Sequence, residues 1–164
     1  MSVWRGVVAG LVGGVIGAGA MSVAHTMVGG ITAGARHQKA PRDQPADDDA
    51  TVKVADGVAR WLIQRPLPDD MKPVAGNLVH YTFGATVGAL YGAVATCVPR
   101  VTLAVGLPFG VAVWFAAHVV TVPALGLAEP PTRRPRSEEG LEFVLHLVYG
   151  VVTELVRRLA RRVL

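Results

Sequence analysis

The chain is poor in charged residues, aromatic residues and cysteine. Charged side chains make up 17% and aromatic ones 6% of the 164 residues. A soluble domain of this length carries more charge and interrupts its apolar runs more often. The single cysteine, Cys97, excludes an internal disulfide and a cysteine-based metal site. The net charge is +4, but no basic stretch alternates with aromatic residues for base stacking, so we expect no nucleic-acid partner.

The signatures of common enzyme classes are also missing. The sequence contains no nucleophile elbow, no phosphate-binding loop, no HExxH motif and no dinucleotide fingerprint. We therefore predict a non-enzymatic protein without a cofactor and without a metal.

What the sequence does contain is long apolar runs. A transmembrane helix needs about 20 apolar residues. We predict an all-α membrane protein, a single domain over 1–164, whose partner is the lipid bilayer. The four expected transmembrane helices lie at about 6–33, 75–98, 101–127 and 140–157. The last is the weakest, because Glu142 and Glu154 lie within it.

The first apolar run has a second interpretation. The stretch Ala18-Gly19-Ala20 after Arg5 resembles a secretory signal with its cleavage site. The apolar run continues to Ala35, which favours a retained helix.

A polar loop over 36–72 separates the first two predicted spans. It holds the acidic run at 47–49, and within it Thr51 to Gln64 has apolar residues at helical spacing, with Trp61 beside them. We expect this amphipathic helix at the membrane surface. Four spans place both termini on one side. Lys and Arg near the membrane are divided between the sides, and we expect an inner-membrane protein with cytoplasmic termini.

Glycines recur every four residues within the predicted spans. Residues four apart share one helix face, and small residues let helices approach closely in lipid. We predict helix-packing faces that also permit self-association or docking of a membrane partner. Their members are Gly6, Gly10, Gly14, Gly84, Gly88, Gly92, Gly106, Gly110 and Gly150.

Each predicted span also carries one histidine on its small-residue face: His25, His80, His118 and His146. We expect the four imidazoles to point inward at similar depth, with Glu142 near them. Three interpretations stay open. The histidines act as hydrogen-bonding glue between helices, as proton-binding groups, or as metal ligands. The metal interpretation is the weakest, because Glu142 with His146 is the one ligand pair within a helix.

Short motifs suggest an internal repeat. The pattern H-x-x-aromatic-G occurs at 80–84 and again at 146–150, and 10–14 resembles 106–110. Two helical hairpins in parallel repeat would follow. We expect Pro108 and Pro123 to kink the third span.

The stretches 79–84, 88–92, 106–110, 122–127, 146–150 and 153–158 resemble the YagU-like family of small bacterial inner-membrane proteins. One branch of that family is associated with acid resistance, so the resemblance implies a role in proton or pH homeostasis. It implies no catalytic residues. Two other functions stay open: a structural or accessory membrane subunit, and a small-solute channel or transporter.

Overall fold

The computed structural model describes residues 2–36 and 50–164, and side chains at 2–28, 50–130 and 132–164. The acidic run at 47–49 lies outside this range. The described chain is mostly helical and contains no strand, as predicted. Its long helices are α1 (Val3–Arg36), α2 (Ala50–Ile63), α3 (Lys72–Cys97) and α6 (Arg136–Val163). The shorter elements are η1 (Pro99–Gly106), α4 (Leu107–Val113), η2 (Trp114–Thr121), α5 (Val122–Ala124) and η3 (Pro131–Arg133).

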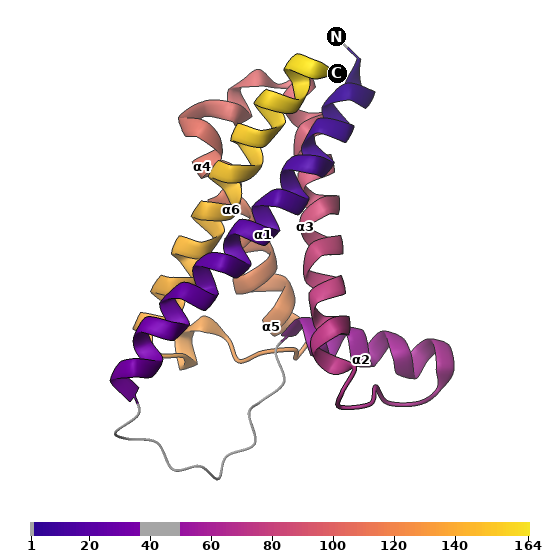
Figure 1. Ribbon diagram of the computed structural model, residues 1–164, viewed down its shortest axis with the longest axis vertical. Coiled ribbons are helices and arrows are strands. Elements are labelled where there is room, and N and C mark those ends of the chain that lie inside the picture. The colour runs from indigo at the N-terminus through magenta and orange to yellow at the C-terminus, as the bar shows by residue number, and fades with distance from the viewer. Residues whose placement is uncertain (1, 37–49) are drawn as a thin grey trace.

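Four helical columns form the bundle. Helix α1 packs against both α3 and α6, and α6 packs against α4. The chain descends in α1, returns in α3, descends again through α4, η2 and α5, and returns in α6 (Figure 1). Both termini and η1 lie at one end of the bundle, called the terminal end here. The opposite end, with α2 and residues 125–135, is called the loop end.

Within the described residues, three helical segments are long and apolar enough to cross a membrane. They are Val3–Val28, Lys72–Cys97 and Pro99–Ala124. These lengths and compositions identify a membrane protein. The fourth predicted span, 140–157, coincides with the middle of α6, which carries too much charge to qualify by composition.

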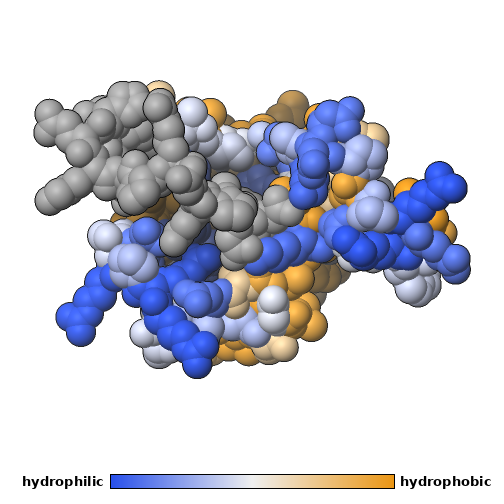
Figure 2. All heavy atoms as spheres, turned by 90° about the horizontal axis from the view of Figure 1, so that it is seen from below, coloured by the Kyte–Doolittle hydropathy of each residue, from blue (hydrophilic) through white to orange (hydrophobic). Residues whose placement is uncertain are grey.

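Many large apolar side chains lie on the outside of the bundle, and several small residues are buried inside it. Leu11, Ile16 and Leu90 are exposed, whereas Ala9 and Ala18 are completely buried. This distribution suits a protein in lipid, where close packing rather than water exclusion holds helices together. Seen from the loop end, hydrophilic side chains cover much of that end and hydrophobic ones show on the flank (Figure 2).

The third apolar run differs from the helix predicted over 101–127, which was expected to begin at residue 101. Leu103 is extended, and Ala104, Val105 and Gly106 have positive φ angles of 49°, 56° and 84°. The regular helix begins only at Leu107. The apolar residues 101–105 therefore form a turn at the terminal end, although their composition is typical of a membrane helix.

The two prolines of this run were expected to kink one long helix. Each instead lies in the first turn of a separate short helix. Pro108 lies in the first turn of α4, where its missing N–H would have no helical partner in any case. Pro123 lies in the first turn of α5, directly after the π-helical segment η2. Proline removes a backbone donor and crowds the preceding turn. We attribute the wider π turn to Pro123. The Thr121 hydroxyl donates to the Ala116 carbonyl there, at 2.7 Å.

Helix α2 lies where the sequence predicts the amphipathic helix, and it runs across the bundle axis at the loop end (Figure 1). Its first half packs on α3, with Ala55 buried and Val52 in contact with Gly76. Its last turn exposes the apolar side chains of Trp61, Leu62 and Ile63.

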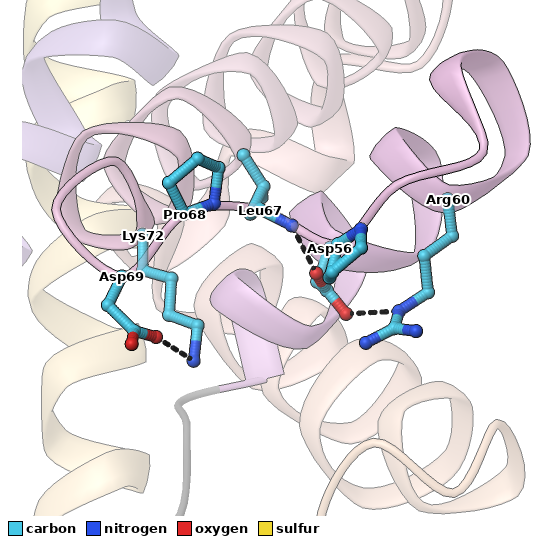
Figure 3. A pocket seen from close by; sticks show the side chains of 7 residues that line it. Asp56, Arg60, Leu67, Pro68, Asp69 and Lys72 are labelled. Carbon is cyan, nitrogen blue, oxygen red and sulfur yellow. Dashed lines mark hydrogen bonds and ion pairs between the residues drawn. The ribbon is translucent and has the colours of Figure 1, made fainter.

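The segment after α2 folds back on that helix. Asp56 accepts hydrogen bonds of 2.7 Å from Arg60 Nε and from the Leu67 amide, beside a hollow of about 390 Å³ (Figure 3). These donors, with Arg60 the larger influence, hold the pKa of Asp56 below its usual value of 3.8. Lys72 forms an ion pair with Asp69 at 2.9 Å on the other side of the hollow.

Candidate functional site

The candidate site is the inward face of α6. This face carries both apolar and polar side chains. They recur at three- and four-residue spacing, which places them on one side of the helix. The buried residues are Leu145, His146, Tyr149, Gly150, Thr153, Glu154 and Arg157. A row of polar groups therefore passes from the loop end to the terminal end inside the bundle.

At the loop end, the row begins with a histidine pair. His118 in η2 places Nε2 3.2 Å from the Glu139 carboxylate of α6. The His118 ring lies 5.8 Å from that of His146, centroid to centroid. His146 Nδ1 donates to the Glu142 carbonyl at 2.7 Å, which fixes the ring orientation. Arg134 approaches Glu139 at 3.8 Å. Residues from three segments thus meet at this point.

Packing next to the histidine pair holds η2 on α6. Trp114, one turn before His118, meets the Phe143 ring edge-on, with centroids 5.0 Å apart. This aromatic contact fixes the separation of the two helices, and with it the distance between His118 and Glu139.

In the middle of the row, aromatic residues connect three helices. The Tyr149 hydroxyl donates to the Gly84 carbonyl of α3 at 2.7 Å. Phe109 of α4 lies between Tyr149 and Tyr91, with ring centroids 5.6 Å and 4.0 Å away. Tyr91 stacks on Phe109 with nearly parallel planes. The row is therefore enclosed by α3 on one side and α4 on the other.

At the terminal end, the row finishes in a buried carboxylate. Glu154 is completely buried and accepts two hydrogen bonds from Arg157, at 2.7 and 2.9 Å. It also accepts one from the Tyr91 hydroxyl at 2.9 Å and one from Arg158 Nε. Arg158 in turn donates to the Thr102 carbonyl of η1 at 3.0 Å. This network ties α6 to α3 and to the turn over 99–106.

The glycines from the sequence analysis lie where helices meet. On α1, Gly6, Gly10 and Gly14 face Gly92, Gly88 and Gly84 of α3. A Cβ atom built on Gly88 would lie 2.5 Å from the Gly10 carbonyl oxygen. Backbones this close leave no space for a side chain.

A second contact of this kind joins α6 to η1 and α4. A Cβ on Gly150 would lie 2.6 Å from the Gly106 carbonyl oxygen and 2.8 Å from Gly110 Cα. The positive φ of Gly106 adds a second reason for glycine there. All nine glycines of the predicted packing faces therefore lie at contacts inside this chain.

The four span histidines take different positions. The structure brings together the rings of His118 and His146. His80 places Nε2 3.3 Å from the Ala18 carbonyl of α1, and His25 is exposed on α1. Glu142 contributes its backbone carbonyl to His146. Among the side chains that the structure describes, no three His, Cys, Asp or Glu residues are arranged to hold a metal ion.

Sequence reasoning missed the network around Glu154. Glu154 counted there as a charge that weakens the fourth span, and Tyr91 lay within the stretch 88–92 without a role of its own. The sequence did contain a signal for this network. Glu154 precedes Arg157 by three residues and Arg158 by four. Opposite charges at these spacings pair within one helix and neutralise each other. Glu139 was likewise missed, because it lies just outside the predicted span 140–157 and its contact with His118 depends on how two helices are rotated.

Comparison with known proteins assigns the chain to a family but not to an activity. No curated protein and no solved structure matches it. The family match covers residues 59–155, from the second half of α2 into α6, and so contains the histidine pair, Tyr91 and Glu154. The resemblance to the YagU-like family stays a prediction. The chain belongs to the family described as "Protein of unknown function (DUF1440)".

Proposed function

We propose that this protein is a non-enzymatic, proton-responsive protein of the bacterial inner membrane. One observation carries the proposal: His118 of η2 and Glu139 of α6 form a 3.2 Å contact beside a second imidazole, His146. An imidazole changes its charge between about pH 5 and 8, so a contact of this composition changes with proton concentration.

The proposal includes α6 as a fourth crossing. Two of the charges within α6 are turned inward and paired with each other: Glu154 is completely buried and Arg157 is 3% exposed. Charged groups within a membrane are found in such inward-facing pairs. Four crossings also agree with both termini lying at one end (Figure 1).

Equivalent contacts support the internal repeat within this proposal. Gly14 of α1 meets Gly84 of α3, and Gly110 of α4 meets Gly150 of α6. These pairs occupy the same positions in the two sets of similar motifs, 10–14 with 80–84 and 106–110 with 146–150. A parallel repeat of two hairpins would produce such a correspondence.

Protonation of either ring would change the charges at this contact. A proton on His118 would create an ion pair with Glu139 and tighten η2 against α6. Protons on both His118 and His146 would place two positive rings 5.8 Å apart and oppose that contact. Arg134 approaches Glu139 at 3.8 Å and already supplies a positive charge there, so an ion pair with His118 would add less. A contact whose charge changes in this way can bias a conformational equilibrium between neutral and acidic pH.

The experiment compares proton flux and acid survival in matched histidine variants. The full chain is reconstituted in liposomes that contain a pH-sensitive dye, and cells carrying each variant are exposed to acid. His118→Gln and His146→Gln are expected to lose most of the response. His25→Gln, an exposed histidine of α1, is the control and keeps it. An unchanged response in the His118→Gln/His146→Gln double variant would contradict the proposal.

The glycine faces give less support to an accessory subunit that docks through them. The faces of α1 and α3 are already filled by each other, and those of α4 and α6 likewise. Self-association or a partner would therefore use the exposed apolar surface of the bundle. Cross-linking of the protein in membranes separates the two cases, since a lone monomer that keeps the acid response supports the proton-responsive function.

A further inference from the structure

The last two turns of α2 extend beyond the bundle and carry an apolar face that the described chain leaves uncovered. Val58, Trp61 and Leu62 lie three and four residues apart, so they share one side of the helix. Their exposed fractions are 49%, 80% and 63%. Figure 1 shows that this end of α2 is its farthest point from the bundle axis. We propose that this face, called the anchor face here, inserts into the lipid bilayer at the loop end.

The depth of α2 follows from its contact with α3. The α3 span, Lys72–Cys97, has 26 residues. Such a helix is about 39 Å long, whereas the hydrocarbon core of a bilayer is about 30 Å thick, which leaves about 5 Å of helix on each side. A Cβ on Gly76 would lie 2.8 Å from Val52 Cγ2 of α2. Gly76 lies four residues into α3, or about 6 Å along its axis, so α2 crosses α3 near the hydrocarbon boundary.

The surface of α3 agrees with this depth. Val74 and Leu78 lie two residues before and after Gly76, and their exposed fractions are 70% and 68%. Apolar side chains so exposed on a membrane helix face lipid. The bilayer that covers them is therefore present at the level where α2 leaves the bundle, and it can meet the anchor face without a further partner.

The opposite side of α2 is polar. Asp56 and Arg60 form an ion pair of 2.7 Å, and the Arg60 side chain is 62% exposed. Leu62 follows Arg60 by two residues, or about 200° around the helix, so the two side chains point in nearly opposite directions. Seen from the loop end, mainly hydrophilic side chains cover the part that projects on the right (Figure 2). The polar side is thus turned away from the bundle, as in a helix that lies in the membrane interface.

The structure divides the roles that the sequence gave to the whole helix. The first half of α2 is held by the bundle, with Ala55 buried, and only the second half is free for lipid. Trp61 suits this position, because an indole ring combines an apolar body with an N–H donor and is enriched at headgroup level. This inference does not rest on the proton response and is tested separately.

Nitroxide labels measure the depth of the two sides of α2 in the full chain. With Cys97 replaced by serine, Leu62→Cys or Arg60→Cys is labelled, and the protein is reconstituted in liposomes of phosphatidylethanolamine and phosphatidylglycerol. Collisions with oxygen, which concentrates among acyl chains, and with a water-soluble nickel chelate give the depth. We expect the label at 62 to lie about 5–10 Å into the boundary between headgroups and acyl chains, and the label at 60 to lie in water. Equal access of the chelate to both labels would overturn the proposal.

A second comparison separates the anchor face from a general loss of apolar surface. A label on Val58→Cys reports the depth in Trp61→Ser/Leu62→Ser and in Val74→Ser/Leu78→Ser, which removes as many exposed apolar side chains from α3. We expect the first variant to move this label into water and the second to leave it among the lipids. The same shift in both variants, or in neither, would overturn the proposal. Spin–spin broadening between labels at 62 would show a second copy on this face and overturn the lipid assignment.

Discussion

Helix α1 meets α3, and α6 meets α4, through equally close contacts between glycines, but the two contact faces differ in polarity. Between α1 and α3, glycine faces glycine, and the contact consists of backbone and small side chains. Between α6 and α4, Gly110 and Gly150 approach as closely, but His146, Tyr149 and Glu154 continue the same face.

The difference shows how a membrane bundle separates stability from polarity. Lipid tails are as apolar as the helices, so burial of apolar surface adds little to helix association, and small residues that permit close contact become decisive. Polar groups inside such a bundle are costly unless they are paired. Here several are gathered on one helix, α6, and Glu154, Arg158 and Glu139 have partners on α3, η1 and η2.

Breaking the buried charge network should have the largest effect on stability. Glu154→Ala leaves Arg157 buried with its positive charge unpaired, and we expect the free energy of unfolding to fall by about 3 kcal/mol. Titration with sodium dodecyl sulfate in micelles measures it. Glu138→Ala, an exposed acid of the same helix, serves as the control and should cost less than about 1 kcal/mol. Similar losses in the two variants would show that Glu154 is not structurally special.

Breaking the apolar contact should cost somewhat less. The new Cβ in Gly88→Ala would lie 2.5 Å from the Gly10 carbonyl and 2.7 Å from Gly14 Cα, so α1 and α3 must separate. We expect a loss of about 1–3 kcal/mol in the same titration. Gly140→Ala, where a Cβ meets nothing within 4 Å, should instead gain up to about 1 kcal/mol from helix propensity. A gain in both variants would contradict the close contact of α1 with α3.

Removing a single hydrogen bond between α6 and α3 should lower the free energy of unfolding less than either of these changes. In Tyr149→Phe the hydroxyl that donates to Gly84 is lost, and we expect a cost of about 1 kcal/mol. Tyr81→Phe, at an exposed tyrosine of α3, is the control and should be neutral. If the two variants are equally stable, the bond between α6 and α3 does not contribute to stability.

The smallest effect is expected outside the bundle, at Asp56. Folding lowers the pKa of Asp56, so its ionised carboxylate stabilises the fold at pH values above its usual pKa of 3.8. This stabilisation, with the bond to the Leu67 amide, is lost as the pH falls through the lowered pKa of the folded protein. Hydrogen exchange at the Leu67 amide should accelerate in that acidic range, relative to neighbouring amides. Asp56→Asn does not titrate and should show no such step. A step that persists in this variant would assign it to another group.

Length and composition predicted the helices better than the contacts between them. The predicted span 75–98 corresponds to α3, and the predicted helix from Thr51 to Gln64 corresponds to α2, since apolar periodicity reports local structure directly. The turn at Leu103 to Gly106 was missed because its residues are as apolar as a helix.

The candidate site was harder to predict than the helices. Periodicity placed His118 and His146 on inward faces, but their meeting depends on the rotation of η2 relative to α6. A rotation of one residue position moves a side chain by about 100° around a helix. The same reason kept Glu139 and Tyr91 out of the predicted site, because their partners lie 21 and 63 residues away.

The most direct test of the proton response measures the separation of η2 and α6 as pH changes. Spin labels are attached at the exposed positions Phe115 and Val144, with Cys97 replaced by serine, and the distance distribution is recorded in lipid at pH 7.5 and pH 5. We expect the distribution to shift between the two conditions in the otherwise unchanged protein and to stay constant in His118→Gln/His146→Gln. A distribution that is the same at both pH values in the protein with both histidines would contradict the account.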